Sequence, residues 1–556
     1  MAHAEQTTAE RIAAWLEDRG VRHAFGVGGA NIEDLFVAVQ ARRPRMQAVL
    51  GKHEHSAGSA ADAYARVRGG VGVVMTTSGG GAMNLVSALA ESFASRVPVL
   101  AIVGEPPTVL QGAGAFQDTS GRAGTVDAAA VFAAVSRWCE RAIDPARVLA
   151  QLDAAWSAAL AQRGPAVLLI AKDVQQAICS ARIEPARSVD APADDAAIAR
   201  AAALLGGDRC LVIAGDQVVR SGARDRLARL VARIDARVAV TPDARDAFDN
   251  HDPRFLGVAG AMGHDAVLRG LAEARACLLV GTRMPILARQ GLEAALRERP
   301  IAWIGDEPPH VVARESLHVG SDPNACLRAL AEVLPQVQPR TVPPRADERA
   351  HDTFDTAAVL AAVARTLPSD GVVLVDAGST GASAAHHLAI PRDARWLLAM
   401  GMAGMGWCFG AAIGAAFASG RRCTVVAGDG AFFMHGLELH TAVEHALPIT
   451  YVILDNRAHG MCLVRERLLL HTDAGYNDFH RSRIGTGLAA MFPRMSAIDC
   501  TDIDALERAL QRAATCPGPA VVCAQLPAVE VPPFQQFEQL SPGLATVARG
   551  AAREDD

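Results

Sequence analysis

The 556-residue sequence lacks several features that mark particular classes of protein. Its eleven cysteines occur singly, without a C-x-x-C pair or a His/Cys cluster at zinc spacing, so reduced core cysteines in the cytosol are expected. No run approaches the roughly twenty apolar residues that span a bilayer. The amino terminus lacks the apolar stretch of a signal peptide. These absences favour a soluble, cytoplasmic protein.

Basic stripes and low-complexity tracts are also missing. The formal net charge is -6 and Lys and Arg are scattered, which gives a nucleic-acid role little electrostatic support. Half of the residues are hydrophobic, a proportion typical of globular proteins with large buried cores. A chain of this length is too long for one core, and three or four domains are expected.

Short apolar runs alternate with amphipathic helical segments in three successive blocks. Continuous apolar strands of this kind predict parallel sheets that helices cover on both faces. The sequence therefore predicts an α/β protein with three doubly wound parallel-sheet domains. The runs that carry this prediction are 71–76, 97–103 and 166–170, then 210–214, 233–240, 276–280 and 301–304, and finally 372–375, 423–427, 449–454 and 520–523.

Two Pro- and charge-rich segments, 181–197 and 335–350, separate these blocks and are predicted to be linkers. The predicted domains are therefore an amino-terminal domain at 1–182, a central domain at 195–335 and a carboxyl-terminal domain at 352–540, followed by a polar tail at 541–556.

The most informative segment is 425–461, in which one strand ends at Gly428-Asp429-Gly430 and the next ends at Asp455-Asn456. The carboxyl ends of neighbouring parallel strands meet at one sheet edge, so Asp429 and Asn456 are expected side by side. A carboxylate and an amide oxygen, with a backbone carbonyl and phosphate oxygens, suit octahedral Mg²⁺. Glycines and a helix amino terminus favour a diphosphate there. The plain alternative is a strand–helix turn with an incidental Asp and Asn.

G-D-G followed at this spacing by D-N-x-x-x-G-M resembles the thiamine diphosphate (ThDP) fingerprint of the acetolactate synthase, pyruvate oxidase and benzaldehyde lyase family. The resemblance implies that Asp429, Asn456 and the carbonyl of Ala458 bind Mg²⁺. Family members more often have two consecutive Asn where this chain has Asp455-Asn456, but the ligand is the second position. The implied diphosphate neighbours are Ser379, Thr380, Gly428, Gly430, Ala431, His459, Gly460 and Met461.

Residues 52–68, KHEHSAGSAADAYARVR, resemble the family helix that carries the activating glutamate, which implies this role for Glu54. A carboxylate at N1′ of the aminopyrimidine favours the imino tautomer, whose nitrogen removes the C2 proton of the thiazolium. The plain alternative is a first-turn helix acid that the helix dipole stabilises. In the segment 401–416, the resemblance implies that Met405 bends the cofactor and that the Ala403 carbonyl holds its amino group.

The first domain supplies further candidates through the same resemblance. TTSGGGAMN at 76–84 matches a family stretch, and Asn84 is implied as a neighbour of the pyrimidine. Gln117 lies sixty-three residues after Glu54, where family members place an active-site Gln, although a solvent-facing loop Gln is the plain alternative. The segment 25–31 would cover the substrate, with Ala30 and Asn31 closest.

The resemblance stops at the acceptor pocket. Arg465 occupies the place of the Trp that selects the acceptor in acetolactate synthases, and it could bind an anionic acceptor or face solvent. Arg289 in the central domain is two places late for a family motif, which weakens the expectation of bound FAD, and Arg137 replaces a family Lys.

Two enzymatic functions remain open from the sequence. One is a carboligase that decarboxylates a 2-keto acid such as pyruvate and passes the acyl carbanion to an acceptor. The other is a decarboxylase or 2-hydroxyketone lyase. A non-catalytic relative is the third possibility, against which the retained Glu54, Met405, Asp429 and Asn456 argue. The resemblance also implies a homodimer or homotetramer with each site between two subunits, and the small residues at 410–418 suggest a helix that packs closely on another.

Overall fold

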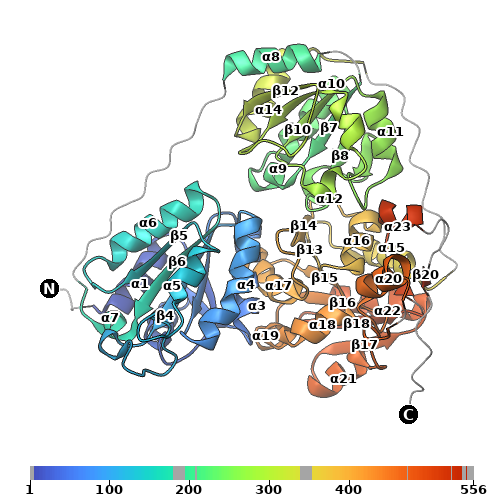
Figure 1. Cartoon of the computed structure of the whole chain (residues 1–556). Coiled ribbons are helices and arrows are strands. Elements are labelled where there is room, and N and C mark those ends of the chain that lie inside the picture. The colour runs from blue at the N-terminus through green and yellow to red at the C-terminus, as the bar shows by residue number, and fades with distance from the viewer. Residues whose placement is uncertain are drawn as a thin grey trace.

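The computed structural model describes residues 6–179, 194–206, 209–338, 353–472, 474–527, 529–540 and 546–547. These residues form three six-stranded parallel sheets with helices on both faces, which confirms the predicted fold class (Figure 1). Most of each predicted linker and of the predicted tail lies outside the described residues, although α8 already begins at Asp195 within the first predicted linker, so the domain boundaries stay predictions.

The first domain has the strand order β2-β1-β3-β4-β6-β5. Strands β3, β4 and β6 are buried along their whole length, as continuous apolar strands of a doubly covered sheet should be. Its elements are α1 (Thr8–Asp18), β1 (His23–Val27), α2 (Glu33–Gln40), β2 (Gln47–Leu50), α3 (Glu54–Arg68), β3 (Gly72–Thr76), α4 (Gly80–Ala94), β4 (Val99–Glu105), η1 (Thr108–Leu110), α5 (Ala128–Ala133), β5 (Trp138–Ala142), α6 (Val148–Ala161), β6 (Pro165–Ala171) and α7 (Lys172–Gln176).

The central domain has a different strand order, β12-β11-β10-β7-β8-β9. Its elements are α8 (Asp195–Leu205), β7 (Cys210–Ala214), α9 (Asp216–Arg220), α10 (Arg224–Ile234), β8 (Arg237–Val240), η2 (Arg245–Ala247), β9 (Phe255–Val258), α11 (Asp265–Glu273), β10 (Ala276–Val280), α12 (Ile286–Arg289), α13 (Glu293–Arg297), β11 (Pro300–Ile304), β12 (Glu315–Gly320) and α14 (Pro323–Val333).

The third domain repeats the topology of the first, with the order β14-β13-β15-β16-β18-β17. Its elements are α15 (Thr356–Thr366), β13 (Val372–Val375), α16 (Ser379–His387), β14 (Arg395–Leu398), α17 (Trp407–Ser419), β15 (Cys423–Gly428), α18 (Asp429–His435), η3 (Gly436–Glu438), α19 (Leu439–Glu444), β16 (Ile449–Asp455), α20 (Gly460–Leu469), α21 (Ile484–Met491), β17 (Ser496–Cys500), α22 (Ile503–Thr515), β18 (Ala520–Gln525), β19 (Val529–Glu530) and α23 (Gln535–Leu540). Within the predicted tail, β20 (Thr546–Val547) pairs antiparallel with β19.

The first and third domains pack on each other through α3 and α17, and their apolar residues form one shared core cluster. A Cβ at Gly410 would lie 2.3 Å from the Ser56 carbonyl oxygen, and one at Gly414 would lie 1.9 Å from the Ala60 carbonyl oxygen. Glycine therefore lets the two helix backbones approach closely. The small-residue helix thus packs closely on another helix, as expected, but this partner belongs to the same chain, and the subunit interface stays a prediction.

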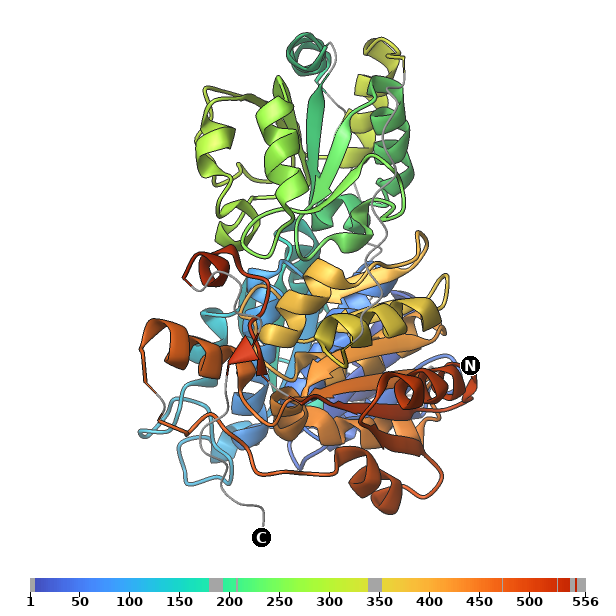
Figure 2. The same ribbon diagram turned by 90° about the vertical axis from the view of Figure 1, so that its right-hand side faces the viewer.

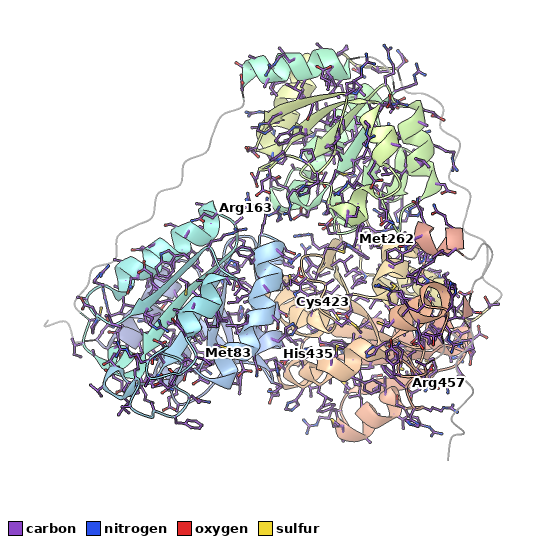
Figure 3. All side chains as sticks on the ribbon, in the orientation of Figure 1. Met83, Arg163, Met262, Cys423, His435 and Arg457 are labelled. Atoms are coloured by element: carbon purple, nitrogen blue, oxygen red, sulfur yellow. The ribbon has the colours of Figure 1, made fainter. Side chains whose placement is uncertain are left out.

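The central domain lies to one side of this pair in both views (Figures 1 and 2). Arg163 reaches from the first domain to Asp306 of the central domain at 3.1 Å, and Met262 of the central domain joins a core cluster of the third (Figure 3). Among the helices of the described ranges, none combines the length and the apolar character needed to cross a bilayer.

Candidate active site

The third domain brings most of the predicted diphosphate and metal residues into one cavity. Asp429 follows β15 and Asn456 follows β16, which is paired with β15 in register up to Gly428 and Leu454. The cavity, about 40 Å³ in volume, is lined by Ala377, Gly378, Ser379, Thr380, Met405, Gly428, Asp429, Gly430, Ala431, Asn456, Ala458, His459, Gly460, Met461 and Cys462.

Two glycines let the side chains around this cavity come close. A Cβ at Gly430 would lie 2.7 Å from Nδ1 of His459 and 3.2 Å from Cε of Met405. A Cβ at Gly460 would lie 2.7 Å from Nδ2 of Asn456. Any larger residue would therefore displace the side chains that line the cavity.

The carboxyl group of Asp429 has the electrostatics of a cation ligand. Its Oδ2 atom is buried and has no hydrogen-bond partner among the described residues. Burial and the nearby Asp455 carboxylate raise the pKa of Asp429 to about 8, and burial also raises the pKa of Asp455. A divalent cation at this point would compensate both charges, so the donor set fits Mg²⁺.

Three predicted or adjacent positions have left-handed backbone without being glycine. They are Gln117 (φ +58°), Ala403 (φ +53°) and Arg457 (φ +57°), the last of which follows Asn456 (Figure 3). Such conformations are costly for residues with a Cβ and gather at binding and active sites.

The first domain brings its own predicted residues together around the turn between β3 and α4. Glu54 begins α3, is 8% exposed and accepts a hydrogen bond of 3.0 Å from Nδ2 of Asn84 on α4. Asn31 is buried and donates to the hydroxyl of Ser78 at 2.7 Å. Gln117 lies against Gly79 in the same turn, since a Cβ there would be 2.8 Å from Cβ of Gln117.

Ala30, Ala403 and Arg465 lie outside the third-domain cavity. Ala30 is exposed and its carbonyl accepts from Nζ of Lys172 at 2.6 Å. Ala403 is exposed in the loop before α17. Arg465 is exposed on α20, one turn after Cys462, which does line the cavity. The roles of all these residues stay predictions.

The described lining of the cavity comes entirely from the third domain, so Glu54 and Asn84 are not part of it. Sequence reasoning missed Ala377, Gly378 and Cys462, which border predicted residues and could have been found as their neighbours. It also missed two buried glutamates, Glu91 and Glu438, that connect the first and third domains.

Three domain models of thiamine pyrophosphate enzymes match the chain. Thiamine pyrophosphate is another name for ThDP. The N-terminal TPP binding domain matches 6–124, the central domain matches 198–330 and the C-terminal TPP binding domain matches 376–524. The chain belongs to the thiamine pyrophosphate enzymes. The Glu54 turn thus lies in a domain of the TPP-binding type, as does the Asp429 cavity.

Relatives of this thiamine pyrophosphate enzyme include acetolactate synthases. The probable large subunit from Methanocaldococcus jannaschii is 28% identical over 82% of this chain and 80% of the relative. The isozyme 1 large subunit from Escherichia coli is 26% identical over 97% of this chain and 96% of the relative. The crystal structure of benzoylformate decarboxylase from Polynucleobacter necessarius has a TM-score of 0.81 over 95% of this chain and all of that one, at 19% identity, and shows the shared fold.

The enzyme has a second cavity of about 300 Å³ beyond the carboxyl ends of β7, β10 and β11, where the central strand order reverses. Two of its arginines pair with carboxylates of the same lining, Arg220 with Asp216 at 2.8 Å and Arg96 with Glu307. Arg289 does not line it and donates to the Met284 carbonyl at 3.0 Å. Arg137, the replacement for the family Lys, lies over the ring of Phe93 in the first domain.

Proposed function

We propose that this chain is a ThDP- and Mg²⁺-dependent enzyme of the acetolactate synthase type. It decarboxylates a 2-keto acid, with pyruvate as the proposed donor, and passes the acyl carbanion to an acceptor. The observation that carries this proposal is the partnerless, buried Oδ2 of Asp429 beside Asn456 in a glycine-lined cavity. The names of the acetolactate synthase relatives support the reaction class.

Each half of the site has a defined task in this proposal. Asp429, Asn456 and the carbonyl of Ala458 hold Mg²⁺, and the amides at the start of α18 with Ser379 and Thr380 hold the diphosphate. Glu54, oriented by Asn84, holds the proton shared with the aminopyrimidine nitrogen. ThDP supplies the carbon nucleophile when it is bound. This proposal does not require FAD.

The test is to incubate the purified protein, ThDP and Mg²⁺ with pyruvate, alone and with a series of aldehydes and keto acids, and in separate mixtures with 2-hydroxyketones in place of pyruvate. Mass spectrometry of the products separates the candidates. A hydroxyketone product supports carboligation, whereas free aldehyde with every acceptor supports the alternative, a decarboxylase or lyase. Unchanged pyruvate and unchanged hydroxyketones in all mixtures would favour the non-catalytic relative.

Replacing Arg465 by Ala should weaken use of an anionic acceptor by roughly 2–3 kcal/mol, the range for losing a charge-assisted hydrogen bond. The exposed guanidinium lies one turn from the cavity and suits a carboxylate or phosphate. Decarboxylation of the donor should remain nearly intact. The measurement is kcat/KM for the acceptor beside donor consumption, with exposed Arg508 on α22 replaced by Ala as the control.

Equal loss of both half-reactions would assign Arg465 to the donor site or to the structure. No loss in either would make it a surface arginine.

The proposal includes a homodimer or homotetramer, which the family resemblance implies. The first-domain residues around Glu54 and the third-domain cavity do not share a lining within the described chain, and ThDP must contact both. The apolar side chains of Phe433 and Leu437, each 54% exposed, and Met402, 60% exposed, support burial against a partner. We place the enzyme in the cytosol, because all eleven cysteines are unpaired.

Mixing the inactive variants Glu54→Gln and Asp429→Ala should restore activity after dissociation and reassociation. If each site combines the first domain of one subunit with the third domain of its partner, every mixed dimer contains one intact site. Random pairing then predicts about a quarter of wild-type activity for a twofold dimer. Native mass spectrometry should show the mixed dimers. Mixed dimers without activity would mean that each site forms within one chain.

A further inference from the structure

The loop 401–406, which carries Ala403 and Met405, is hydrogen-bonded to two carboxylates that belong to different domains. The amides of Gly401, Met402 and Ala403 donate to Glu91 of the first domain at 3.1, 2.5 and 3.3 Å. Further along the loop, the amide of Gly406 donates to Asp376 of the third domain at 3.0 and 2.9 Å.

Residues 401–404 are exposed, and only Gly401 among them lies close against Ala94 and Ser95 at the end of α4. The carboxylates therefore supply much of what holds this backbone in place.

Glu91 is built to remain charged under this loop. It lies on α4, is 3% exposed, accepts from the hydroxyl of Ser95 at 2.5 Å and lies 3.4 Å from Nη2 of Arg66. Burial opposes ionisation, but Arg66 and the hydrogen bonds from Ser95, Met402 and Gly401 hold the pKa of Glu91 below its ordinary value. An ionised acceptor makes stronger hydrogen bonds to amides than a neutral one does.

Glu438 makes the converse contact from the third domain to the first. It lies in η3, is 4% exposed and accepts the amide of Lys52 on both oxygens, at 3.2 and 3.1 Å. Thr441 orients it through a hydrogen bond of 2.8 Å. Lys52 is two residues before Glu54, so this contact restrains the turn from which α3 and the predicted activating carboxylate begin.

We propose that Glu91 and Glu438 are positioning residues that act reciprocally across the contact between the first and third domains. Glu91 sets the loop that presents Ala403 and Met405, and Glu438 sets the turn that presents Glu54. The inference rests on the proposed assignment of these residues to a ThDP site. In one chain, the first domain holds the segment that presents Ala403 and Met405, and the third domain holds the segment that presents Glu54. In the proposed dimer these two segments belong to different active sites.

Packing supports a rigid link between the two carboxylate contacts. Helix α3 begins two residues after Lys52, and α17 begins two residues after Met405. These helices make the most extensive contact between elements of the described chain, with glycines at Gly410 and Gly414 against the backbone of α3. Because this helix contact is rigid, replacing one of the two glutamates should loosen only the backbone segment that it binds and should leave the packing of the two domains unchanged.

The first test replaces Glu91 by Gln and follows the apoprotein by hydrogen–deuterium exchange. The amides of 401–403 should exchange about tenfold faster, because an ionic acceptor is lost, while those of 51–54 should not change. In the presence of Mg²⁺, the affinity for ThDP should fall about tenfold, whereas the affinity for inorganic pyrophosphate should not change. Pyrophosphate probes the diphosphate cavity alone, so the difference locates the effect at the loop.

The second test replaces Glu438 by Gln, which should give the opposite pattern. Exchange should rise at Lys52 and the following turn and stay at the wild-type rate in 401–403. Glu530→Gln is the matched control, since Glu530 also accepts a backbone amide, from Thr356 at 2.8 Å, but within the third domain. It should alter exchange only near Thr356 and leave ThDP binding unchanged.

The two variants keep the inference testable if one of them fails to fold, because each has its own segment and readout. Uniform acceleration of exchange over both domains would overturn the inference and make the glutamates ordinary stabilising groups. Unchanged exchange at both segments would overturn it as well. If the wild-type protein does not bind ThDP at all, the proposed function is contradicted. The exchange rates at 401–403 and 51–54 in the two variants would still test the reciprocal contacts.

Discussion

The Glu54→Gln variant should bind ThDP and Mg²⁺ with near-normal affinity, yet exchange the C2 proton of the bound cofactor about 10²–10⁴-fold more slowly. Binding should persist because the diphosphate and metal donors lie in the third-domain cavity, which Glu54 does not line. Exchange should slow because an amide cannot hold a proton at the pyrimidine nitrogen as a carboxyl group does. Glutamine retains the shape needed for the contact with Asn84.

The measurement is deuterium uptake at C2, followed by NMR after acid quenching, with binding measured by calorimetry. Glu10→Gln is a suitable control, because Glu10 is also a first-turn helix acid, in the capping box of α1, and should not affect C2 exchange. Near-normal exchange in the Glu54 variant would mean that Glu54 only stabilises the start of α3, and another group would have to activate the cofactor.

Asp429→Ala and Asn456→Ala should each abolish Mg²⁺-dependent binding of ThDP while the protein stays folded. Each change removes one of the two side-chain oxygens proposed for the cation, and Mg²⁺ tolerates loss of such a donor poorly. Removing Asp429 also removes a buried carboxyl group whose pKa is raised to about 8, so at neutral pH the metal-free protein loses a mostly protonated group rather than a stabilising charge.

Calorimetric titration with ThDP at saturating Mg²⁺ checks this expectation, and circular dichroism checks folding. Asp455→Asn provides the control, because it creates the two consecutive asparagines that are commoner in the family and leaves both proposed ligands in place. That variant should still bind ThDP. Wild-type affinity in both alanine variants would place the cation and the diphosphate elsewhere.

The strand-end chemistry could be predicted from the sequence because it is local. Gly428-Asp429-Gly430 and Asp455-Asn456 each follow an apolar strand, and the short connection between these strands brings both ends to one edge. The three parallel sheets were predictable for the same reason, since each strand is a continuous apolar run. The prediction that Glu54, Asn31 and Gln117 belong to one site came from the family resemblance and not from their spacing in the sequence.

Contacts between distant segments could not be predicted in this way. Glu91 is the only charged residue of α4, and nothing near it in the sequence identifies the amides of 401–403 as its partners. The pairing of α17 with α3 was missed because small residues indicate close packing without identifying the partner. The identical strand order of the first and third sheets likewise depends on pairing across the chain.

The shared core of the first and third domains has a consequence for how the protein is made. During synthesis the first domain leaves the ribosome before the whole central domain, and α17 follows later still. Until then the face of α3 that later meets Gly410 and Gly414 has no partner, and apolar residues of the shared core remain open to water. Contacts of such long sequence separation also form slowly. Heterologous expression should therefore benefit from slow translation and from chaperones that hold the nascent first domain.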